Sequence, residues 1–79
     1  MFNFSANNLI IVSKKQYDKC NVFILKDRTT TRCYKIYDFL KIASFDSGKP
    51  YCISGRVNSS NKLYLVLDGV KEDKKNAPL

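Results

Sequence analysis

The sequence predicts an α+β fold, a small single domain with a mostly antiparallel β body and one or two short helices. Three observations lead to this expectation. The chain has 79 residues, which suffices for one domain. Short apolar runs bounded by polar residues recur along it, as is typical of strands. Two segments, Ile36–Ala43 and Leu63–Val70, also fit the spacing of an amphipathic helix.

The first half of the chain contains two apolar runs of strand length. Leu9–Val12 is rich in β-branched residues and predicts the first strand, and Asn21–Lys26 predicts the second. The polar stretch Asp27–Thr31 predicts a turn after it. We therefore expect a hairpin between the second strand and whatever follows this turn.

The segment Arg32–Phe39 predicts a third strand. Its alternation puts Tyr34 and Ile36 on one face, and on the other face Cys33, Lys35 and Tyr37. From Ile36 onward the spacing of a helix competes with that of a strand, and the sequence leaves both open.

The second half begins with a turn and a clear strand. Gly and Pro in Asp46–Pro50 predict the turn, and strict alternation over Tyr51–Asn58 predicts the strand. Gly55 within this strand predicts a bulge or a close approach of backbone. Arg56 then projects from the face opposite Val57.

The last apolar segment fits two periods. Leu63, Leu65 and Leu67 alternate as in a strand, but the leucine content favours a short helix that Gly69 would end. We expect a single β-rich domain over residues 1–70 and a charged tail over residues 71–79.

The charge balance indicates an anionic partner. Fourteen Lys and Arg against seven Asp and Glu give a formal net charge of +7, which makes nucleic acid the leading partner class. The alternative, a basic surface that is only solvated, stays open. The candidate RNA-binding residues are the basic groups near strand ends and on outward faces: Arg28, Arg32, Arg56, Lys14, Lys15 and Lys19.

Aromatic side chains are interleaved with these basic residues. Bases stack on such rings in proteins that bind single strands, although each ring also suits the rim of a small core. The candidates for stacking are Tyr17, Tyr34, Tyr37, Tyr51 and Tyr64.

The sequence offers little for catalysis or cofactors. Histidine is absent and the carboxylates are scattered, so we expect no enzyme. The three cysteines, Cys20, Cys33 and Cys52, form no CxxC pair, so we expect buried or half-buried free thiols, no disulfide, no zinc and no cofactor. We also expect no secretory signal, no membrane partner and no small-molecule substrate.

The second half of the chain resembles the eukaryotic small-subunit ribosomal protein family numbered twenty-one. Tyr51–Gly55 matches that family's aromatic, small, aliphatic, small, Gly strand, Asn58–Asn61 its polar break, Leu63–Leu67 its short helix and Asp68–Gly69 its final pair.

The first half follows the same family order. Its matching residues are Leu9–Val12, Lys14, Lys15, Lys19, Cys20, Ile24, Leu25, Asp27 and Tyr34–Ile36, so the resemblance covers about residues 9–70. The chain is shorter than the family pattern between Cys20 and Gly55.

The resemblance implies a structural constituent of the small ribosomal subunit in the cytoplasm. Such a protein binds ribosomal RNA and other small-subunit proteins, with a laminin-receptor-like protein among them, and supports maturation of the small-subunit RNA. Two alternatives remain. One is an oligonucleotide-binding barrel that binds single-stranded nucleic acid, which needs Leu63–Leu67 to be extended. The other is a β-grasp interaction module with a helix at Tyr37–Ser44.

Overall fold

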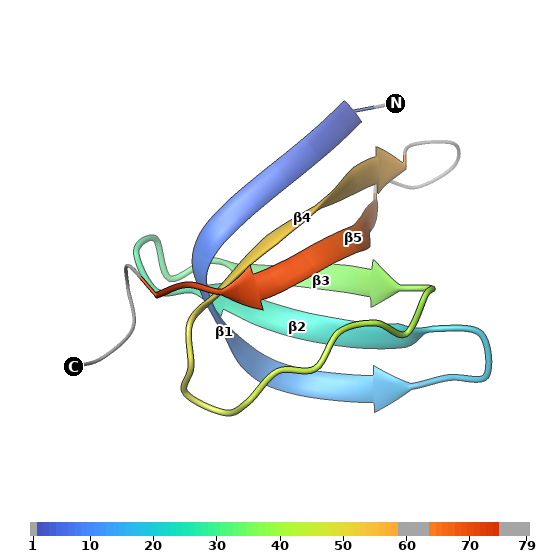
Figure 1. The fold of residues 1–79 in the computed structure, drawn as a ribbon, viewed down its shortest axis with the longest axis horizontal. Helices are drawn as coiled ribbons and strands as arrows, with labels where there is room; N and C mark the ends of the chain where they lie inside the picture. The colour runs from blue at the N-terminus through green and yellow to red at the C-terminus, as the bar shows by residue number, and fades with distance from the viewer. Residues whose placement is uncertain (1, 59–63, 75–79) are drawn as a thin grey trace.

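Alternating apolar and polar residues build five strands in the computed structural model, which describes residues 2–58 and 64–74. The strands are β1 Phe2–Gln16, β2 Asn21–Asp27, β3 Cys33–Asp38, β4 Tyr51–Asn58 and β5 Tyr64–Glu72. They close into a barrel in the order β1-β2-β3-β5-β4 (Figure 1). Neighbouring strands are antiparallel except β3 and β5, which run parallel through the pairs Ile36–Leu65 and Tyr37–Val66.

Strand β1 is long because it serves both sides of the barrel. Its second half pairs with β2 from Leu9 to Gln16, and its first half pairs with β4 from Phe2 to Leu9. The strand bends between these halves, where the register shifts and Asn8 adopts a positive φ of 56°. A positive φ is tolerated by Asn more readily than by most residues.

The core is formed by side chains that point into the barrel from all five strands, and by one loop residue: Leu9, Phe23, Leu25, Ile36, Ile53, Leu67 and Ala43. The loop between β3 and β4 covers this core. In it, Phe45 packs edge-on against Phe23 and Tyr51, with ring centroids 4.7 and 5.0 Å apart. The loop between β3 and β4 therefore covers the core with aromatic packing, and it contains no helix.

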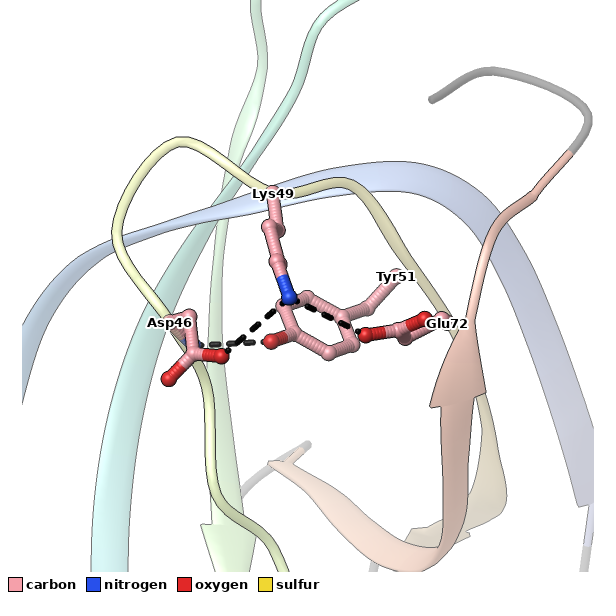
Figure 2. Close-up of polar contacts among 4 residues, drawn as sticks. All are labelled: Asp46, Lys49, Tyr51 and Glu72. Carbon is pink, nitrogen blue, oxygen red and sulfur yellow. Dashed lines mark hydrogen bonds and ion pairs between the residues drawn. The ribbon is translucent and has the colours of Figure 1, made fainter. Parts of the chain in front are cut away.

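The end of this loop is tied to β5 by polar contacts (Figure 2). Lys49 Nζ lies 3.3 Å from Glu72 Oε1 and 3.5 Å from Asp46 Oδ2, and the Asp46 N–H donates to the Tyr51 hydroxyl at 2.8 Å. The hydrogen bond to Glu72 and the charges of both carboxylates raise the pKa of Lys49 above its usual value. Because these side chains are half exposed or more, the ion pairs orient the loop and stabilise it little.

The predicted α+β fold class is wrong, since the described residues contain strands and no helix. In Ile36–Ala43, the first segment that fits both a strand and a helix, the chain is a strand through Asp38 and then turns. Asp38 accepts hydrogen bonds from the N–H groups of Ile42 and Ala43, and Lys41 has a φ of 54°, outside the helical region. The helix that the β-grasp alternative needs at Tyr37–Ser44 is therefore not formed.

The second ambiguous segment is also extended. Leu65 and Leu67 point toward the core while Val66 points outward, so pairing with β4 and β3 overrides the helical preference of leucine. Leu63, the first leucine of this segment, lies outside the described residues. Strand β5 runs past the expected boundary at residue 70, and Asp73 is buried.

Predictions from strict alternation are confirmed. Tyr51–Asn58 is strand β4, and the register shifts next to Gly55, where a Cβ atom would collide with the Val66 carbonyl. Within the part of the chain that the structure describes, no helix is long and apolar enough to cross a membrane.

Candidate nucleic-acid interface

The outer surface of β2, β3 and the second half of β1 forms one continuous face. Phe23, Leu25 and Ile36 point into the core, so the residues between them point outward. Cross-strand pairing aligns these outward residues in rows. We call this surface the β2–β3 face; its residues are Ile10, Ser13, Lys15, Val22, Ile24, Lys26, Cys33, Lys35 and Tyr37.

The centre of the β2–β3 face is apolar, although it lies on the outside of the barrel. Val22 is only 6% exposed, because Lys15 pairs beside it on β1 and Tyr37 pairs beside it on β3. Beyond Tyr37, the same row continues on β5 with Val66, which is also buried. Tyr37 therefore stands between two buried valines.

The aromatic ring of Tyr37 belongs to a stack. The Phe39 ring lies 6.1 Å from it at an interplanar angle of 15°, and Lys35 Nζ lies 5.5 Å from the Tyr37 centroid. Phe39 is 46% exposed. Two near-parallel rings beside a cation provide a platform on which a flat, anionic ligand can stack.

The charge of the β2–β3 face is positive. Lys15, Lys26 and Lys35 lie on it, one on each of its three strands, and none of its nine residues is acidic. The side chains combine an apolar floor, an aromatic platform and ammonium groups at spacings set by the strands. This combination suits a polyanion that carries planar groups.

The six predicted RNA-binding residues do not form one patch. Lys15 lies on the β2–β3 face, and Lys19 lies in the adjoining loop between β1 and β2. Arg56 lies two strands from Tyr37 in the same row, and its Nε is 3.2 Å from Asp68 Oδ2.

The other three predicted residues lie elsewhere. Lys14 is on the core side of β1, with Nζ 5.8 Å from the Phe23 ring centroid. Arg28 and Arg32 flank the turn between β2 and β3, at the end of the barrel opposite Lys19 (Figure 1). Those two arginines therefore cannot share a short site with Lys15 and Tyr37.

The predicted stacking tyrosines also divide. Tyr37 has the platform position, and Tyr17 is 53% exposed in the loop between β1 and β2. Tyr34 packs against the core, and buried Tyr51 uses its hydroxyl to hold Asp46. The side chain of Tyr64 lies outside what the structure describes.

Sequence reasoning missed Val22, Ile24, Lys26 and Lys35 of the face, and it missed Phe39, which stacks on Tyr37. The alternation in β3 already put Lys35 beside Tyr37, which was a usable signal. The choice of that face as the outer one required the knowledge that Ile36 is in the core.

The cysteines are free thiols that differ in exposure: Cys20 is buried, Cys52 is half-buried and Cys33 is exposed. The expectation that all three are at least half-buried is wrong for Cys33, because it points outward on β3 beside Lys26. Among the described residues, no group of three or more His, Cys, Asp or Glu side chains is placed to hold a metal ion.

Comparison with known proteins finds no family model, no curated protein and no solved structure that matches this chain. The small five-stranded barrel fits loosely the class of oligonucleotide-binding barrels. In that class, strands two and three and the loops after strands one and four form the ligand surface. The β2–β3 face lies at the corresponding strands, and the loop after β4 lies outside the described residues.

Proposed function

We propose that this protein binds single-stranded nucleic acid on the β2–β3 face. The observation that carries the proposal is the Tyr37–Phe39 ring stack beside Lys35. In a single strand the bases are free to stack on such rings, whereas in a duplex their faces are occupied. Lys15 and Lys26 then lie where the phosphates of a strand crossing β1, β2 and β3 would pass.

The ribosomal assignment stays a prediction. Its short helix at Leu63–Leu67 is not formed over the described residues 64–67, which belong to β5. Sedimentation of a cell extract therefore tests this assignment separately. The assignment includes binding to ribosomal RNA and to a laminin-receptor-like protein, and a location on the cytoplasmic ribosome. The prediction requires nearly all of the protein to sediment with the small ribosomal subunit.

Titration of a labelled 12-nucleotide oligomer with purified protein, followed by fluorescence anisotropy, tests the proposed function. Tyr37→Ala removes the platform and weakens binding by about 1–3 kcal/mol, the usual value for stacking one base. Tyr37→Phe keeps the ring and retains most of the affinity. Lys35→Ala weakens binding, whereas Lys71→Ala, an equal charge change at an exposed residue of β5, has a smaller effect. Equal affinity in Tyr37→Ala and wild-type protein would exclude this face as the binding surface.

A further inference from the structure

The turn after β3 exposes three large apolar side chains within four residues. Phe39, Leu40 and Ile42 are 46%, 66% and 50% exposed. Single exposed apolar residues are common, but a contiguous group usually marks a surface that binds something. We call residues 39–42 the apolar loop.

The apolar loop is held in place at its base and at its tip. At its base, the fully buried carboxylate of Asp38 accepts hydrogen bonds from the Ile42 N–H at 3.3 Å and the Ala43 N–H at 2.9 Å. At its tip, Lys41 Nζ donates to the Asp18 carbonyl at 3.0 Å, which joins the loop to the one between β1 and β2. The apolar side chains are thus presented on a segment that three hydrogen bonds anchor.

The apolar loop overlaps the aromatic platform at Phe39. Phe39 stacks on Tyr37, and Leu40 and Ile42 follow directly in the chain. A single strand stacked on the two rings would therefore have Leu40 beside it. Bases that are still paired would meet an aliphatic side chain at this point, with no further ring to stack on.

We propose that the apolar loop is a wedge that enters nucleic acid at the junction between single strand and duplex, so that the protein opens base pairs. The proposal rests on the proposed function. Leu and Ile side chains inserted between base steps are known to unstack them. The charges around the loop favour a polyanion over a second copy of this chain, because each copy carries +7 and Lys19 and Lys41 outnumber Asp18 at this end.

The test measures the opening of a DNA hairpin with a single-stranded overhang, labelled with a fluorophore and a quencher, in excess complementary trap strand. Wild-type protein should raise the opening rate by at least about tenfold, since burial of even one aliphatic side chain lowers the barrier by that factor. The double variant Leu40→Ser, Ile42→Ser should keep its affinity for an unstructured oligomer and lose the acceleration. Rates are compared at equal single-strand occupancy, because any single-strand binder shifts the equilibrium by mass action.

Val12→Ser is the matched control, because Val12 is 55% exposed on β1 and outside the apolar loop; it should open the hairpin as wild-type protein does. The single variant Leu40→Ser serves if the double variant does not fold by circular dichroism. Undiminished opening by the folded loop variants overturns the wedge. Sedimentation equilibrium that shows a wild-type dimer and a monomeric loop variant assigns the loop to a second copy, and also overturns it. If wild-type protein binds no unstructured oligomer, the proposed function itself fails; if it binds without accelerating opening, only the wedge fails.

Discussion

The backbone N–H of Asn8 donates a 2.8 Å hydrogen bond to the Asp73 carboxylate, across 65 positions of the chain. Asn8 sits at the bend of β1, and Asp73 follows directly after β5. Asp73 is 4% exposed, and its own N–H donates to the Pro50 carbonyl at 3.0 Å. One residue therefore joins the bend of β1, the start of β4 and the end of β5.

Asp73→Ala should destabilise the barrel by about 1–3 kcal/mol, because it leaves a part-buried N–H of Asn8 without its acceptor. Asp73→Asn retains an acceptor and should cost less. Urea unfolding followed by circular dichroism measures both. The control is Asp46→Ala, whose side chain is 70% exposed and whose loss should change the free energy of unfolding by no more than about 0.5 kcal/mol. Equal effects of the Ala variants at both positions would contradict the role given to Asp73.

Gly55→Ala should be among the most damaging single substitutions in the described strands. A Cβ atom at Gly55 would overlap the Val66 carbonyl oxygen and lie 2.7 Å from a Phe4 ring carbon, and the backbone of β5 cannot move aside without breaking its pairing with β4. We expect a loss of about 3 kcal/mol or failure to fold.

Gly69→Ala is the matched control for Gly55. Its Cβ would lie 3.2 Å from the Ser54 hydroxyl oxygen. Because the small Ser54 side chain can turn away, the loss in the free energy of unfolding should stay near 1 kcal/mol. The thermal unfolding midpoints of the two variants, measured side by side, decide the comparison. A midpoint for Gly55→Ala at or above that of Gly69→Ala would show that the contact between β4 and β5 is looser than described.

Local alternation predicted the strands whose two faces differ in polarity. Ile53 and Cys52 fall on opposite faces of β4, and Ile36 and Lys35 fall on opposite faces of β3. The alternation with a period of two could therefore be recognised in the sequence. The first part of β1 carries the same signal, which our sequence analysis missed: the apolar residues Phe2, Phe4 and Ala6 alternate with polar ones, and Phe4 and Ala6 pack against the core.

The site was predicted less well than the strands, for a related reason. Arginines were preferred by residue type, but Arg28 and Arg32 lie in a turn at the far end of the barrel. Strand pairing determines which cations share a surface, and Arg56 reaches the row of Tyr37 only through the parallel pairing of β3 with β5. Tyr37 and Lys35 were on one predicted face, but no local pattern showed that this face is the outer one.

The salt dependence of binding should depend on the lysines of the β2–β3 face. Each phosphate contact with a single strand contributes about 0.7 to the slope of log affinity against log salt, so replacing Lys15, Lys26 and Lys35 by Ala should lower the slope by about 2. Arg28→Ala with Arg32→Ala should change it little. The measurement is the anisotropy titration repeated over a salt series. A larger loss of slope from the arginine pair would move the phosphate path to the turn between β2 and β3.

Thiol labelling should give an independent map of the face. Cys33 is exposed beside Lys26, so maleimide should react there first at neutral pH, and bound oligomer should slow that reaction.

Cys52 should react with maleimide more slowly than Cys33. Its burial, and then the charge and hydrogen bond of Asp73, raise the pKa of its thiol above the usual value, and only the thiolate reacts. The Cys52 rate should therefore continue to climb as pH rises past 9.0, the ordinary thiol pKa, and Asp73→Asn should speed it at neutral pH. Mass spectrometry of the labelled peptides reads both sites at once, with Cys52 as the internal control for ligand protection. Equal protection of both cysteines by an oligomer would mean that binding tightens the whole barrel, whereas protection of Cys33 alone places the ligand on the β2–β3 face.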